Sequence, residues 1–238
     1  MPVCKLCLSD RELCKSHIVP KFFFDALRND KNQLLGINGV GNIGRRLLQD
    51  GPAEPLLCDA CEQHINDHFE KPFLQSWGDF SPLPNPWNVP EPHWITVDYA
   101  SFKLFHLSVL FRAGSCSLPT FLEINLGKHL EKIRQMLLHQ DPGEFWEYPI
   151  SGLVPVHHKT GNIVPIVSKG QQGRMEDLNC YAMLYGGVQW WTVVSSHRNY
   201  LVERESLRAD GRIPFYSIPW QELDVMQSAS AALRRKRK

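Results

Sequence analysis

Apolar residues recur at helical spacing in three stretches of the chain. Ile65, Phe69 and Phe73 lie four residues apart, which places them on one face of a helix expected over residues 58–73. Residues 98–112 are apolar almost throughout, so they predict a helix buried on all sides. The third stretch is marked by Leu122, Leu126, Leu130, Ile133 and Leu137.

The C-terminal part of the chain has the pattern of strands. Residues 181–185 and 188–194 are rich in aromatic and β-branched residues, and they flank Gly186-Gly187, a typical two-residue hairpin turn. Residues 153–157 and 163–167 flank a second turn-like stretch. We therefore expect an antiparallel sheet packed on helices, and an α+β fold class.

Prolines divide the sequence. Residues 82–92 contain five of them, which excludes regular structure there. We predict four parts: an N-terminal module over 1–80, a linker over 81–93, an α+β domain over 94–228 and a basic tail over 229–238.

The N-terminal part contains two weaker signals. A short helix is expected to begin at Pro20, because proline is well tolerated in the first turn of a helix. The glycine-rich residues 31–51 favour a turn or hairpin. Residues 39–44 match a dinucleotide-binding pattern by letter, but no βαβ unit surrounds them, so we do not interpret them as a nucleotide site.

Composition and charge narrow the class of protein. The 43% hydrophobic and 21% charged content is that of a globular chain, and no apolar run approaches the roughly 20 residues that cross a membrane. No basic stretch followed by an apolar core marks a secretory signal, so we expect a cytoplasmic protein without a membrane partner. Net charge is +1, and the last five residues are all basic. Such a tail can bind phosphates, act as a nuclear-import signal or increase solubility.

The strongest chemical signal is a pair of Cys-x2-Cys motifs. Two such pairs can supply four thiolates to one tetrahedral zinc ion, and we predict a structural Zn²⁺ there. The predicted ligands are Cys4, Cys7, Cys58 and Cys61. Cys14 is close enough in sequence to be a spare ligand or a packed thiol, and Cys116 and Cys180 lie in apolar contexts typical of a core.

These motifs carry a resemblance to a known family. The chain resembles the zinc-bearing branch of the His-Asn-His (HNH) endonucleases, whose active site is a ββα-metal module, and especially a largely uncharacterised bacterial and phage set. The shared elements are Ser16 to Lys21 (SHIVPK), Gln49-Asp50-Gly51, Leu56 to Glu62 (LLCDACE) and Glu70 to Phe73. The resemblance covers about the first 75 residues.

The resemblance implies roles for particular residues. His17 would be the general base that activates water, and Glu62 would bind a catalytic Mg²⁺ or Mn²⁺ on the helix. Asn66 and Glu70, one and two helical turns on, would complete that site. The sequence departs from the family pattern at two positions: Ser16 stands where a metal ligand is usual, and Ala53 where a loop asparagine is usual.

Other readings of these residues stay open. His17 can instead serve as a structural neighbour of the zinc loop, and Glu62 can simply stabilise the helix dipole. His64 and His68 form an alternative metal pair at i, i+4 spacing. Trp190 and Trp191 are expected in the core rather than as a platform for stacked bases.

Two functions follow from these observations. The first is a metal-dependent endonuclease that cleaves DNA, in the setting of phage or mobile-element defence or counter-defence that the resemblance suggests. The second is a non-catalytic zinc module that binds nucleic acid or a partner protein, with the C-terminal domain supplying specificity.

Overall fold

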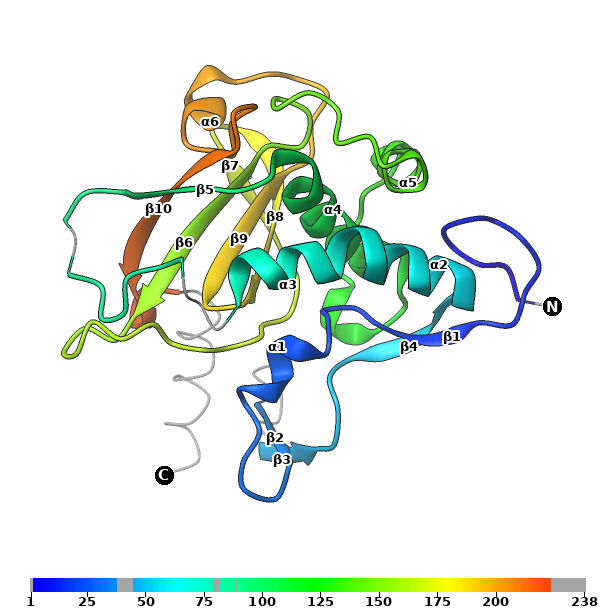
Figure 1. The fold of residues 1–238 in the computed structure, drawn as a ribbon, viewed down its shortest axis with the longest axis horizontal. Coiled ribbons are helices and arrows are strands. Elements are labelled where there is room, and N and C mark those ends of the chain that lie inside the picture. Colours follow the sequence, from blue (N-terminus) through cyan, green and yellow to red (C-terminus); the bar gives the residue numbers. More distant parts are fainter. Residues whose placement is uncertain (1, 38–44, 79–81, 89, 224–238) are drawn as a thin grey trace.

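The fold combines a small N-terminal unit with a six-stranded sheet covered by helices (Figure 1). The computed structural model describes residues 2–37, 45–78, 82–88 and 90–223. The α+β class expected from the sequence is confirmed. The predicted basic tail, residues 229–238, lies outside the described residues.

The N-terminal unit is built on two antiparallel strands and the helix that follows them. Strand β1 (Cys14–His17) pairs with β4 (Ala53–Leu57), and α2 (Asp59–Ile65) begins directly after β4. The chain between the strands forms one helical turn, α1 (Phe22–Asp25), and a hairpin.

The hairpin expected within residues 31–51 is present. It consists of β2 (Leu34–Ile37) and β3 (Arg45–Leu48), paired antiparallel. The glycine-rich pattern over 39–44 lies outside the described residues.

The helix that starts with α2 runs past the predicted end. The chain continues through a π-helical turn, η1 (Asn66–Glu70), into α3 (Lys71–Trp77). Pro72 lacks an N–H group, and its ring would clash with the carbonyl four residues back in a regular helix. The wider turn just before it, where the Lys71 N–H donates to the Asn66 carbonyl, accommodates the proline, so the helix does not stop there.

The large sheet is mixed rather than purely antiparallel. Its strands are β5 (His93–Thr96), β6 (Ile150–Val156), β7 (Gln171–Met175), β8 (Leu178–Tyr185), β9 (Val188–Val193) and β10 (Arg212–Pro219). Their order is β5-β10-β6-β9-β8-β7, and β10 runs parallel to β6. The chain turns back through α6 (Tyr200–Arg204) before it enters β10. The strand pattern of the sequence does not predict that β10 runs parallel to β6.

The hairpin predicted at Gly186-Gly187 is confirmed. It joins β8 to β9, and both glycines have positive φ angles, 61° and 76°, which a side chain rarely allows.

Two helices predicted from apolar periodicity are present. Helix α4 (Tyr99–Ser115) is buried along most of its length, and α5 (His129–His139) follows a short 3-10 turn, η2 (Pro119–Phe121). Helix α5 begins later than the leucine spacing suggested, since Gly127 has a φ of 51° that interrupts helical geometry. A second 3-10 turn, η3 (Trp220–Glu222), follows β10.

The N-terminal unit and the sheet share one hydrophobic core. Phe73 of α3 stacks on Phe105 of α4 with ring centroids 3.8 Å apart, and Trp77 lies 5.3 Å from Trp190 of β9. The Trp77 Nε1 donates a hydrogen bond to the Gly186 carbonyl at 3.1 Å. Residues before and after the proline-rich segment therefore pack as one body.

The two faces of the sheet differ. Trp190 is 2% exposed and points toward α3 and α4, whereas the next residue, Trp191, lies on the opposite face and is partly exposed. The expectation that both tryptophans lie in the core therefore applies fully to Trp190. No described helix is long and apolar enough to cross a membrane.

Candidate metal centre and histidine–carboxylate pair

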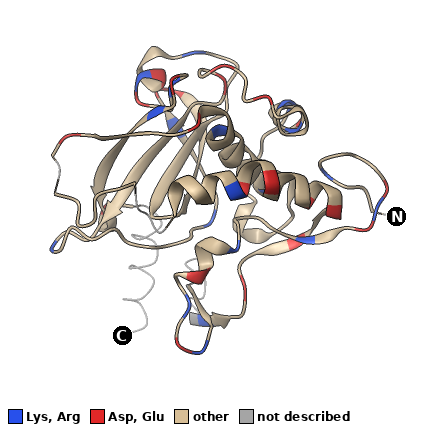
Figure 2. Ribbon diagram, in the orientation of Figure 1, with Lys and Arg blue, Asp and Glu red and all other residues tan. Residues whose placement is uncertain are grey.

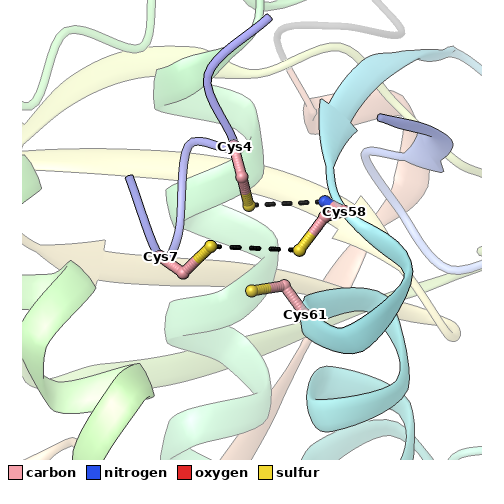
Figure 3. Close-up of side chains that lie close together, drawn as sticks. All are labelled: Cys4, Cys7, Cys58 and Cys61. Carbon is pink, nitrogen blue, oxygen red and sulfur yellow. Dashed lines mark hydrogen bonds between the residues drawn. The ribbon is translucent and has the colours of Figure 1, made fainter. Parts of the chain in front are cut away.

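The four predicted zinc ligands meet at one point. The sulfur atoms of Cys4, Cys7, Cys58 and Cys61 all lie within 4.8 Å of one another (Figure 3). The Cys7 and Cys58 sulfurs are 3.9 Å apart. Tetrahedral coordination with Zn–S bonds of about 2.3 Å requires sulfurs about 3.8 Å apart, so the four side chains fit a zinc ion with little adjustment.

Local backbone geometry orients each pair of cysteine sulfurs toward the centre of the cluster. The first knuckle, Cys4 to Cys7, is closed by a hydrogen bond from the Leu8 N–H to the Cys4 carbonyl, and Leu8 has a positive φ of 59°; the second knuckle is Cys58 to Cys61. Cys58 precedes the first residue of α2, and its carbonyl accepts the Cys61 N–H. The Cys58 N–H also points to the Cys4 sulfur at 3.3 Å, which couples the two knuckles.

The thiols of this cluster have unequal acidity. Burial raises the pKa of Cys58 and of Cys61. Burial also acts to raise the pKa of Cys7, but hydrogen bonds from the Ser9 amide and hydroxyl outweigh it and lower that pKa to about 6. A bound cation would displace the remaining protons, because thiolates rather than thiols are the ligands of zinc.

Helix α5 holds the first knuckle in place. Arg134 is 8% exposed, and its Nη1 donates to the Leu6 carbonyl, between Cys4 and Cys7, at 2.6 Å. Its other nitrogens bind Glu131 at 2.7 Å. A guanidinium beside thiolates also offsets part of their negative charge.

His17 lies at the end of β1, against a carboxylate. Its Nε2 atom is 2.9 Å from Asp50 Oδ2, although the two atoms are not aligned for a regular hydrogen bond. Partial burial raises the pKa of Asp50, but the His17 imidazole and the Gly51 N–H outweigh it and hold that pKa below its usual value. Arg28 lies 3.8 Å from the same carboxylate. A carboxylate next to an imidazole can stabilise the protonated ring that forms when a histidine acts as a general base.

The residues at the two unusual positions are structural. Ser16 is fully buried, and its hydroxyl accepts the Leu57 N–H at 3.2 Å, so it fastens β1 to the second knuckle. Ala53 pairs with His17 across the strands. Its neighbour Glu54 binds the Ser117 amide at 2.8 Å and hydroxyl at 2.9 Å, which ties β4 to the end of α4.

Glu62 lies in the first turns of α2 with a buried oxygen. No described group hydrogen-bonds to its Oε1. The carboxylate acts on Cys14 of β1, where burial first, and then the charges of Asp59 and Glu62, raise the pKa of the thiol. A carboxylate oxygen without a partner is suited to accept a hard cation such as Mg²⁺.

Glu70 and Asn66 lie in different environments. Glu70 Oε1 is 2.8 Å from Arg112 Nη1 of α4, with exposed side-chain fractions of 16% and 2%. Asn66 is exposed. The π turn between them changes the helical register, so a common stripe with Glu62 is not preserved as a regular helix would preserve it.

The alternative ligands have other partners. His64 Nε2 lies 2.9 Å from the Leu137 carbonyl, which links α2 to α5, and its ring is 4.9 Å from that of His68. Cys180 is fully buried, as expected, and Cys116 is half-buried. Within the described ranges, the four-cysteine cluster is the one group of three or more His, Cys, Asp or Glu ligands close enough to hold a metal.

Charges of both signs are spread over the visible ribbon, and acidic segments recur along the helical run from α2 to α3 (Figure 2). Comparison of the chain with family models, curated proteins and solved structures gives no match.

Three partners in this region were not assigned roles from the sequence. Asp50 belongs to the Gln49-Asp50-Gly51 motif without an implied role, and Arg134 and Arg112 are distant in sequence from the residues that they contact. Arg112 and Arg134 each place a basic side chain at an otherwise apolar helix position. That pattern is the one sequence signal that marks them as buried partners of carboxylates or carbonyls.

Proposed function

We propose that this protein is a metal-dependent endonuclease that cleaves phosphodiester bonds of DNA. The observation that carries the proposal is the contact of His17 with Asp50 at the end of β1, within a strand–strand–helix unit fixed by the cysteine cluster. It rests also on the sequence resemblance to HNH endonucleases.

In this proposal His17 takes a proton from water. Asp50 beside Nε2 favours the tautomer that carries its proton there, which leaves Nδ1 as the acceptor nitrogen. Asp50 also stabilises the imidazolium that forms. The cluster of sulfurs has a structural role, because four protein ligands leave no open position for substrate.

Glu62 is the residue that would hold a catalytic Mg²⁺ or Mn²⁺. Its unpartnered oxygen fits a hard cation, which when bound would stabilise the negative charge developing on the phosphate. With no second multi-ligand cluster among the described residues, water and phosphate oxygens would complete the coordination, as is common for Mg²⁺.

Plasmid nicking tests the proposal. The wild type, His17→Ala, Asp50→Asn and Glu62→Gln are compared with Mg²⁺ or Mn²⁺, with His197→Ala as a matched control at an exposed histidine. Loss of a general base should lower the rate about 100-fold or more, while the control keeps full activity. Zinc content and thermal unfolding are measured for each variant. A wild type that holds zinc but nicks no DNA with either metal contradicts the proposal.

Two observations favour a second candidate, a non-catalytic zinc module that binds nucleic acid or a protein. Ser16 is buried and bound to backbone, and Glu70 is paired with Arg112, so neither is free to bind a metal in this state. Intact binding to DNA without nicking by the zinc-loaded protein would favour this candidate.

A further inference from the structure

The outer face of the large sheet carries aromatic side chains on three strands. Trp94 of β5, Tyr216 of β10 and Trp191 of β9 all point away from α3 and α4. The register sets this arrangement: Trp94 pairs with Pro214, Tyr216 with Leu153, and Ser151 with Trp191. Phe215 and Trp190, the neighbours of Tyr216 and Trp191, point inward and contact Trp77.

These aromatic rings are accessible. Trp94 is 39% exposed and Tyr216 is 37% exposed. Trp191 is half-buried, and its ring lies over Gly173 of β7, where a Cβ atom would be only 2.9 Å from the indole. The glycine therefore leaves room for the indole to lie across the strand. Helix α6 covers the far end of this face through Val202, next to Cys180 and Val193.

A cavity lies between Trp191 and Tyr216. It has a volume of about 540 Å³, and its walls include Leu153, Met175 and Arg204. That volume lies within the roughly 300–1,000 Å³ of small-molecule pockets. The indole Nε1 of Trp191 has no hydrogen-bond partner within the described part of the chain.

Arginines accompany the aromatic rings. The guanidinium of Arg208 lies 4.4 Å from the Trp94 ring centroid, and that of Arg212 lies 5.9 Å from it. Arg208 forms no ion pair within 4.0 Å among the described residues; its Nη2 donates to the Arg204 carbonyl at 3.4 Å, and the charges of Glu205 and Asp210 lie near it. Acidic groups are also present, but they are paired: Glu205 with Arg204 and Tyr216, and Asp210 with Arg212.

We propose that this outer sheet face, defined by Trp94, Trp191, Tyr216, Arg204 and Arg208, binds single-stranded nucleic acid. Bases stack on the exposed rings, because every base has a π face, and phosphates contact the Arg208 guanidinium, since that of Arg204 is paired with Glu205. A duplex hides its base faces in the stack, so the same surface discriminates against it. This binding role rests on the proposed endonuclease function. In it, the outer sheet face holds an unpaired segment of the substrate away from His17.

Fluorescence anisotropy with a labelled 12-nucleotide DNA of mixed sequence tests the inference. The full chain carries His17→Ala and no Mg²⁺ is added, so binding is measured apart from cleavage. Trp94→Ala and Tyr216→Ala should each raise Kd roughly 5- to 150-fold, the range for loss of one stacked base. Trp94→Phe and Tyr216→Phe keep a ring and should bind within a few-fold of the parent.

Matched controls separate stacking from unfolding. Leu122→Ala removes an exposed apolar side chain, 70% exposed, outside this face and should leave Kd unchanged. Arg208→Gln should weaken binding and flatten its salt dependence. A blunt duplex of the same sequence should bind more weakly than the single strand.

Several results would overturn the inference. They are equal affinity of the parent and the two alanine variants, equal affinity for duplex and single strand, and self-association of the chain that Trp94→Ala abolishes. Because the assay involves no cleavage, its failure leaves the nicking result untouched, and inactivity in nicking leaves this binding test valid.

Discussion

The ion pair between Glu70 and Arg112 gives the most specific prediction about stability. Arg112 is 2% exposed, its Nη1 is 2.8 Å from Glu70, and its Nε donates to the Ser108 carbonyl at 3.3 Å. Its Nη2 has no hydrogen-bond partner among the described residues. Glu70→Ala therefore leaves a buried guanidinium without its counter-charge.

The cost can be worked out from that burial. Leaving one partner of a buried pair unmatched costs about 3–5 kcal/mol. In a chain of this size, such a loss lowers Tm by about 6–20 °C. Replacing both partners, as Glu70→Leu with Arg112→Met, removes the buried charge altogether and should cost far less than Glu70→Ala alone.

Urea and thermal unfolding followed by circular dichroism measure these differences as a double-mutant cycle. A loss below about 1 kcal/mol for Glu70→Ala would show that the pair is exposed in solution, and would contradict a buried ion pair. A further variant, Glu70→Gln, separates two roles of Glu70. A structural residue loses stability and activity together, whereas a metal ligand loses nicking in Glu70→Gln while Tm holds.

Two further predictions concern the metal centre and the histidine. Arg134→Met removes the hydrogen bond to the Leu6 carbonyl and a positive charge near Cys7, so it should weaken zinc retention about 10- to 100-fold. Competition with a chromogenic chelator measures the retention. Unchanged retention would contradict a supporting role for the guanidinium. The pKa of Asp50 is held below its usual value of 3.8, so its ionised form stabilises the fold above that pH, and this contribution is lost as pH falls through the lower folded-state pKa. The free energy of unfolding of Asp50→Asn, measured in urea, should therefore fall less than that of the wild type between about pH 5 and pH 2. Identical pH profiles for the two proteins would contradict a stabilising role of the ionised carboxylate.

Local patterns in the sequence predicted local structure well. The cysteine spacing within each pair identified the two metal-binding turns, because each turn is closed by hydrogen bonds between near neighbours. The i, i+4 spacing of Ile65, Phe69 and Phe73 identified a buried face, and each of the three is 1% exposed. Gly186-Gly187 predicted its hairpin, because the turn depends on φ angles of those two residues alone.

Features that depend on distant contacts were not accessible from the sequence. The parallel pairing of β10 with β6 depends on how the chain returns after α6, which no local pattern encodes. The helix passes Pro72 because a π turn precedes it, and that turn is stabilised by packing of η1 and α3 on α4. The partners of His17 and Glu70 come from a loop and from a later helix, so sequence spacing could name the residues but not their contacts.

Four sulfurs from two separate segments are expected to hold one zinc ion and thereby to fix β1, β4 and α2 around His17. Zinc K-edge X-ray absorption on the purified protein, with the metal quantified per chain, tests it most directly. We expect one zinc per chain with four sulfur neighbours at about 2.3 Å. No tightly bound zinc, or a shell in which nitrogen or oxygen replaces two of the sulfurs, would contradict it.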